Sequence, residues 1–128
     1  MAEQQPTTQA QQPIMTKAER ATKIRRDKLE MMAVQFYTEF KQACKQCHQL
    51  GRYSITWGAV IPAIIPSSDE DLDEVLELFA GHLNDLGLTS LEWCNAPVRT
   101  TWQEEPVRHG SHVHLRAEWQ ASMGARFG

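Results

Sequence analysis

The chain has 128 residues, of which 41% are hydrophobic and 23% charged, and its formal net charge is -3. This length predicts one domain with a modest core. The longest apolar run, residues 59–65, contains Pro62 and is too short to cross a bilayer, so we expect no association with a membrane. The three cysteines and the polar start of the chain argue against secretion and a disulfide framework, and we expect a cytoplasmic protein.

Residues 1–15 form a polar segment that is rich in Gln, Thr, Ala and Pro. Such a composition buries too little apolar surface to offset the entropy lost on ordering, so we expect a flexible arm. An arm of this kind becomes ordered only against a partner, for example a neighbouring subunit.

A long amphipathic helix is predicted over residues 16–51. Thr16 and Glu19 have the spacing of a capping box, and Gly51 is typical of a helix end. At a rise of 1.5 Å per residue the helix would be roughly 50 Å long, which is more than a domain of this size needs to cover its core. We therefore expect part of its apolar stripe to contact another chain. The expected interface residues are Leu29, Met32, Phe36, Tyr37 and Phe40.

The first third of this helix is strongly basic. Its positive side chains are Lys17, Arg20, Lys23, Arg25, Arg26 and Lys28. These side chains could neutralise the phosphates of a nucleic acid, which gives affinity that is independent of base sequence. No aromatic residue is interleaved with them, so a solvated helix face or a protein partner explains the same charges. The three interpretations stay open at this point.

Residues 44–48, Cys-Lys-Gln-Cys-His, match the C-x-x-C-H motif of covalent haem attachment. The motif lies inside the amphipathic helix without a preceding export signal, and both cysteines belong to the apolar stripe. We therefore interpret the two thiols as core residues and expect no cofactor. The alternative is a zinc site. Its ligands would be Cys44 and Cys47 together with His112 and His114, or with Cys94.

Residues 52–122 are predicted to form a small α+β domain, which gives the chain the element order α-β-α-β-β-β. Strand patterns cover residues 53–58, 88–94, 98–102 and 112–119. A second helix begins after Ser68 and ends near Gly87. A helix between two strands permits a parallel crossover, so we expect a small mixed sheet with the helices on one face. Residues 123–128 are expected to be a loose C-terminal tail.

The last strand carries the candidate ligand site. Its polar positions include His112, His114 and Arg116, which alternate with apolar residues and share one face. If strand 98–102 lies beside it, Arg99 and Thr101 project to the same face, and these donors suit a phosphate or a carboxylate. The alternative is an ordinary solvated sheet face. The four tryptophans fall on strand patterns and are interpreted as core residues.

The chain has no P-loop and no G-x-G-x-x-G, G-x-S-x-G or H-E-x-x-H motif, and we expect that it is not an enzyme. The expected function is that of a self-associating subunit or accessory component of a larger assembly, as a homo-oligomer or with another protein. The long helix and the N-terminal arm would make the contacts. The alternatives are a module that binds a small anionic ligand or nucleic acid, through the polar sheet face or the basic helix, and a zinc-binding protein.

Overall fold

The computed structural model describes residues 14–62, 68–95 and 101–128. Its elements are α2 (Lys17–Gln49), β1 (Ser54–Val60), α3 (Asp69–Asn84), β2 (Ser90–Cys94), β3 (Trp102–Gln103), β4 (His112–Glu118) and the 3₁₀ helix η1 (Ala121–Phe127). The predicted α+β class and the order α-β-α-β-β-β are confirmed, with η1 as an addition at the end. The predicted N-terminal arm, up to residue 13, lies outside the described residues.

The helix α2 begins where its capping box predicts. The N–H of Glu19 donates to Oγ1 of Thr16 at 3.1 Å, and the N–H of Thr16 donates to Oε1 of Glu19 at 2.9 Å. At the other end Gly51 has a φ of 76°, and the N–H of Arg52 donates to the carbonyl oxygen of Cys47 at 2.9 Å. Glycine adopts this backbone conformation without steric cost, so residues close in sequence fix both ends of the helix.

The helix α3 also starts at a side-chain cap. Oγ of Ser68 accepts the N–H of Asp71 at 3.3 Å. Asp69 and Glu70 lie in the first turn, where the positive end of the helix dipole favours carboxylates. The predicted second helix is therefore confirmed. No helix in the described parts of the chain combines the length and the apolar character that crossing a membrane requires.

The four strands form one sheet in the order β1-β4-β2-β3. β4 pairs with β1 over seven residues, from Ser54 opposite Glu118 to Val60 opposite His112, and it pairs with β2 on its other side. Every pairing among the described strands is antiparallel, which differs from the mixed sheet that the sequence predicted. β1 and β2 do run in the same direction, as the connection through α3 permits, but β4 lies between them.

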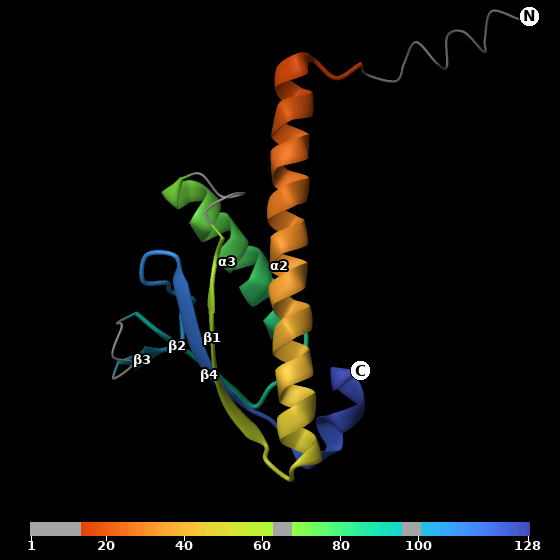
Figure 1. Cartoon of the computed structure of the whole chain (residues 1–128), viewed down its shortest axis with the longest axis vertical. Coiled ribbons are helices and arrows are strands. Elements are labelled where there is room, and N and C mark those ends of the chain that lie inside the picture. Colours follow the sequence, from red (N-terminus) through yellow and green to blue (C-terminus); the bar gives the residue numbers. More distant parts are fainter. Residues whose placement is uncertain (1–13, 63–67, 96–100) are drawn as a thin grey trace, which may run out of the picture.

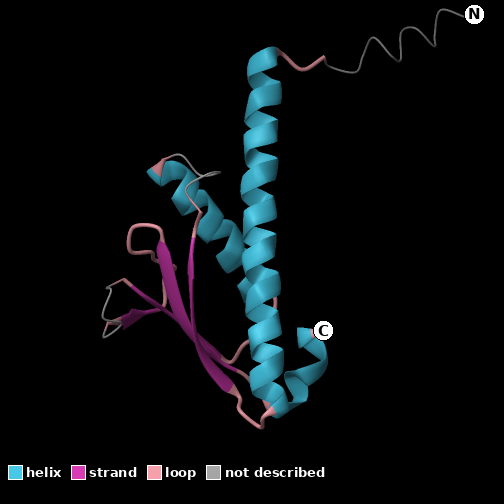
Figure 2. Ribbon diagram, in the orientation of Figure 1, coloured by secondary structure: helices cyan, strands magenta, loops and turns pink. Residues whose placement is uncertain are grey.

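Both helices cover the same face of the sheet, as the sequence predicted (Figure 1, Figure 2). The core between the two layers is aromatic. The ring of Phe79 lies between 5.5 and 6.4 Å, centre to centre, from the rings of Phe36, Phe40, Trp57 and Trp93. Such tilted and edge-on contacts add to the stabilisation that comes from burying apolar area.

The C-terminal residues pack on the end of the domain, beside the last turns of α2 (Figure 1). Met123 and Phe127 of η1 are buried, and the ring of Phe127 lies 5.1 Å from that of Trp119. This packing corrects the loose tail predicted for residues 123–128. The physical reason is that two apolar side chains, four positions apart, reach the same core.

Candidate functional site

The face of the sheet away from the helices is the polar surface that the sequence predicted. The buried side chains of β4 are Val113, Leu115 and Ala117. Its exposed or half-buried side chains are His112, His114, Arg116 and Glu118. The predicted alternation of apolar and polar positions is therefore confirmed, and three of the candidate ligand residues share one face.

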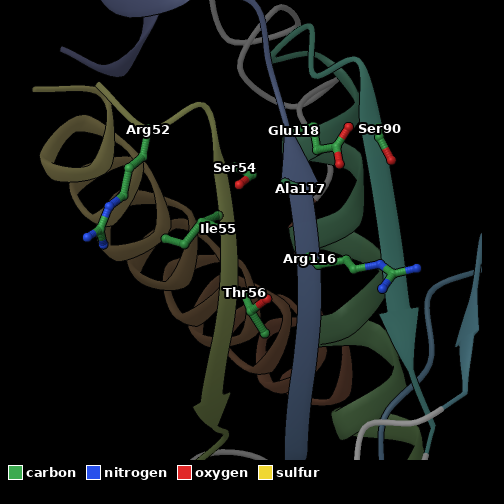
Figure 3. A pocket seen from close by; sticks show the side chains of 8 residues that line it. All are labelled: Arg52, Ser54, Ile55, Thr56, Ser90, Arg116, Ala117 and Glu118. Carbon is green, nitrogen blue, oxygen red and sulfur yellow. The ribbon is translucent and has the colours of Figure 1, made fainter. Parts of the chain in front are cut away.

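A depression of about 350 Å³ lies on this face, across β1, β4 and β2 (Figure 3). Its polar lining residues are Arg52, Ser54, Thr56, Ser90, Arg116 and Glu118. The side chain of Arg52 points away from β4, whereas Arg116 extends towards β2 (Figure 3). The depression therefore offers hydroxyl groups and one guanidinium beside the carboxylate of Glu118, and its two arginines do not converge.

Arg116 already has partners within the chain. Its Nε donates to Oε1 of Glu92 at 2.8 Å, and its guanidinium lies 4.5 Å from the ring centre of Trp102. An anion bound here would share Arg116 with Glu92. The sequence placed Trp102 in the core, but the strand pairing places it on the other face of the sheet. Trp102 lies opposite Cys94 of β2, and Cys94 lies opposite His114 of β4. Residues directly opposite each other share a face, so all three lie on the face away from the helices. Only the strand register reveals this position of Trp102.

His114 lies over a glycine of the neighbouring strand. A Cβ atom at Gly58 would be 2.6 Å from Cδ2 of His114, so a larger residue at position 58 would displace the imidazole. The rings of His112 and His114 are stacked, with centres 6.1 Å apart and planes 9° apart. Thr101 is exposed just before β3, and Arg99 lies outside the described residues.

The zinc ligands that the sequence suggested are not all brought together: Cys94 lies opposite His114 in the sheet, but Cys44 and Cys47 belong to α2 and pack on the core side. Cys44 is buried in the core that α2 forms with the sheet, whereas His112 and His114 lie on the other face of the sheet. Residues 14–62, 68–95 and 101–128 contain no group of three His, Cys, Asp or Glu residues that could hold a metal ion. Burial, with a smaller effect of Cys47, raises the pKa of Cys44 to about 12, so its thiol stays protonated at neutral pH. The interpretation of Cys44 as a core residue is confirmed.

His48, the last residue of the C-x-x-C-H motif, belongs to an aromatic cluster at the end of the domain. Its Nδ1 accepts the indole N–H of Trp119 at 3.3 Å. Its ring centre lies 5.3 Å from that of Tyr53 and 6.1 Å from that of Phe127. A Cβ atom at Gly124 would collide with the imidazole, so η1 packs closely against this histidine. The contacts of His48 therefore hold the C-terminal residues on α2.

The basic side chains at the start of α2 divide into two groups. Arg25 forms ion pairs with the buried Asp71 and, at 3.4 Å, with Glu74 of α3. Lys23 forms an exposed pair with Asp27 at 2.9 Å. Within the described residues, four basic side chains of this segment have no ion pair: Lys17, Arg20, Arg26 and Lys28. These four are exposed and can meet an anionic partner.

The side chains predicted at a subunit interface are enclosed by their own chain. Four of them are at most 5% exposed: Leu29, Met32, Phe36 and Phe40. Tyr37 is half-buried, and its ring stacks on that of His82 in α3 at 5.2 Å. This finding corrects the residue assignment, because α3 and the sheet already cover the main apolar stripe of α2. A second subunit would have to contact other residues.

A second set of apolar side chains lies on the outer side of α2. Ile24, Met31 and Val34, which we call the outward strip, are 50%, 70% and 42% exposed. Spacings of seven and three residues place them on one helix face. The first buried residue of α2 is Leu29, so residues 17–28, the projecting segment, extend past α3 and the sheet (Figure 1). A search of the sequence for a second apolar periodicity would have identified the outward strip.

Comparison of the chain with protein-family models, with curated proteins and with solved structures gave no match. No family is therefore shown for the chain. Its function has to be inferred from its own residues and from their geometry.

Proposed function

We propose that the protein is a non-enzymatic subunit that self-associates through the outward strip of α2 and serves as a component of a larger assembly. The observation that carries this proposal is the projecting segment, because α2 begins at Lys17 although its first buried side chain is Leu29. The odd number of cysteines, three, suits the reducing cytoplasm, which we propose as the compartment.

The projecting segment has no buried side chain, and among its described residues Arg25 links it to α3 through the ion pairs with Asp71 and Glu74. A helical segment with so few tertiary contacts has only marginal stability in water, because most helix stability in proteins comes from packing of an apolar face. The capping box nevertheless starts α2 at the far end of the projecting segment. Ile24 in this segment, together with Met31 and Val34, exposes apolar surface to solvent. A partner helix on the outward strip would bury that surface and stabilise the segment.

The partner that we propose is α2 of a second copy of the chain. In an antiparallel arrangement centred on Met31, the two Met31 side chains meet and the two basic segments point to opposite ends. A parallel arrangement would bring the basic segments together, and their repulsion would weaken the contact. A two-fold contact of this kind uses the same surface on both subunits and is the commonest form of soluble assembly.

Sedimentation equilibrium of the full chain over a wide range of concentration tests the proposal. We expect a mass above the 14.6 kDa of one chain, and a smaller species when Ile24→Glu and Met31→Glu are combined. Leu50→Glu is the matched control, since Leu50 is an exposed apolar residue at the other end of α2. A monomer at every concentration, or an unchanged mass in the double variant, would overturn the proposal.

A second candidate function is the binding of a small anion in the depression on the sheet. The observation in its favour is that the hydroxyl groups of Ser54, Thr56 and Ser90 line the same depression as Arg116. Titration with inorganic phosphate, followed by amide chemical shifts, should perturb these strands, and Arg116→Gln should remove the effect. Arg20→Gln is the control, because Arg20 is exposed far from the sheet. Unperturbed shifts in the wild-type chain would exclude this function.

A further inference from the structure

The strand β1 is an edge of the sheet, with β4 as its only neighbour among the described strands. The ladder continues past both ends of β1, since the N–H of Trp119 donates to the carbonyl oxygen of Tyr53 and the N–H of Ile61 donates to that of Ser111. Tyr53 and Ile61 therefore direct their backbone groups to β4, and every second residue between them does the same. The intervening residues direct their N–H and C=O groups away from the sheet. These outward residues are Ser54, Thr56, Gly58 and Val60.

This free edge lacks the features by which proteins prevent pairing of strands between chains. Charged side chains, proline, bulges and very short edge strands are the usual protection. β1 has the sequence Ser-Ile-Thr-Trp-Gly-Ala-Val, without charge or proline, and its seven-residue register with β4 is uninterrupted. The other edge strand, β3, has two residues. Within the described residues, no backbone hydrogen bond reaches the outward groups of β1.

The inner side chains of β1 also lack complete cover. Ile55, Trp57 and Ala59 face the helices but are only half-buried. The ring of Trp57 contacts those of Phe36 and Phe79 within the chain, with centres 6.2 and 5.5 Å apart. A further strand beside β1 would cover the remaining surface of Trp57 and of its two neighbours, in addition to forming backbone hydrogen bonds.

We infer that the free edge of β1 pairs antiparallel with β1 of a second copy, so that two four-stranded sheets become one continuous eight-stranded sheet. This inference rests on the proposed self-association and adds a second contact to it. With a two-fold axis at Trp57, Ser54 lies opposite Val60 and Thr56 lies opposite Gly58 in the other copy. Every outward residue then pairs with an outward residue, and no two charges oppose each other.

The register centred on Trp57 has a further consequence for packing. Trp57 would lie opposite its own copy in a non-hydrogen-bonded pair, in which the Cα atoms are about 4.5 Å apart and the side chains are close. Aromatic side chains opposite each other are among the stabilising pairs of a sheet. The half-exposed tryptophan is therefore the residue that gains most from the contact.

Two separate two-fold contacts on one subunit, at the outward strip and at β1, build an assembly larger than a dimer. Combined Ile24→Glu and Met31→Glu removes the contact of α2 and should leave a dimer held by β1. Blocking β1 alone should leave a dimer held by α2, and both changes together should give a monomer. The contact of α2 and the contact of β1 can therefore be disproved independently of each other.

Thr56→Pro is the substitution that blocks β1, because the N–H of Thr56 points away from β4 and its loss leaves the ladder within the subunit intact. Thr56→Lys is the second variant, which places a charge on the free edge in case proline disturbs folding. His112→Lys is the control, since it adds the same charge to an exposed position of β4, a strand that already has two neighbours. Circular dichroism and the melting temperature report whether each variant is folded.

Hydrogen exchange of the amides of β1, in the background of Ile24→Glu and Met31→Glu, tests the inference directly. We expect the outward amides of Thr56 and Gly58 to exchange at least about 100-fold more slowly than amides of an unpaired edge. Both edge variants should abolish the protection of the Gly58 amide and halve the mass, and Thr56→Lys should also abolish the protection of the amide at position 56, which proline lacks. The control should change neither protection nor mass. Rapid exchange of the outward amides in a folded chain, or protection in a monomer, would overturn the inference whatever α2 does.

Discussion

The indole N–H of Trp119, just after β4, donates a hydrogen bond of 3.3 Å to Nδ1 of His48 in the last turn of α2. An indole nitrogen can only donate, so Nδ1 carries no proton and the neutral ring has its proton on Nε2. The bond joins two residues that are 71 positions apart in sequence. It closes the end of the domain on which η1 packs.

Trp119→Phe removes the donor and leaves Nδ1 of His48 without its partner. We expect a coupling energy of about 1 kcal/mol between Trp119→Phe and His48→Phe, because the hydrogen bond is lost in either single variant. Urea unfolding of the two single variants and of the double variant measures it. Additivity of the two changes would contradict the hydrogen bond as a contribution to stability.

Phe127→Ala should destabilise the chain by about 3 kcal/mol, since it leaves a cavity beside Trp119 and His48. The free energy of unfolding in urea is the measurement. Ser122→Ala, at an exposed position of the same 3₁₀ helix, is the control and should have little effect. If Phe127→Ala were as mild as the control, the C-terminal residues would not belong to the core.

Arg25→Met should cost more stability than Lys23→Met, because Arg25 pairs with the buried Asp71 and with Glu74, whereas the pair of Lys23 with Asp27 is exposed. Asp71 is 3% exposed, and loss of Arg25 leaves its carboxylate buried without this partner, which we expect to cost more than the loss of an exposed pair. The pair of Lys23 with Asp27 is exposed on both sides and should be worth less than about 0.5 kcal/mol. Thermal and urea unfolding compare the two variants, and equal losses would contradict the importance of burial.

The stability of the chain should fall as the pH rises above about 9. Burial raises the pKa of Cys44 from 9.0 to about 12, so between these values the thiol ionises in the unfolded chain and not in the folded one. The contribution of Cys44 is therefore complete below pH 9 and is lost as the pH approaches 12, with a slope of up to about 1.4 kcal/mol per pH unit.

Urea unfolding at a series of pH values, for the wild type and for Cys44→Ala, isolates this effect. Burial, with a smaller effect of Asp85, also raises the pKa of Tyr37, so a second decline above about pH 10 should remain in the variant. The decline between pH 9 and 10 should disappear in Cys44→Ala. An identical profile of the two proteins in that range would contradict the burial of the thiol.

The sequence predicted the helices well because their signals lie within a few residues of each other. Thr16 with Glu19 starts α2, Gly51 ends it, and Ser68 starts α3, each through hydrogen bonds or backbone geometry of one helix turn. The alternation of β4 is equally local, because successive side chains of a strand point to opposite faces. These patterns also put His112, His114 and Arg116 on one face before any tertiary contact is considered.

These local patterns could not predict which residues form the candidate sites, because those residues are distant in sequence. The main stripe of α2 is apolar whether its cover is a neighbouring subunit or its own α3 and sheet, and periodicity does not distinguish these cases. The sequence also could not exclude a metal site shared by Cys44 and His114. The structure places these two residues on opposite faces of the sheet. The sequence also could not predict the face of the sheet on which Trp102 lies, because that face depends on the pairing of Trp102 with Cys94.

The sequence by itself determined where the helices begin and end, which residues of β4 face the core, and that the chain is α+β. Tertiary structure alone decided that β4 lies between β1 and β2, that α3 covers the main stripe of α2, and that β1 is left as an uncharged edge. The physical reason is range: caps and periodicity depend on neighbours within a turn, whereas strand order and the choice of partner depend on contacts between distant residues.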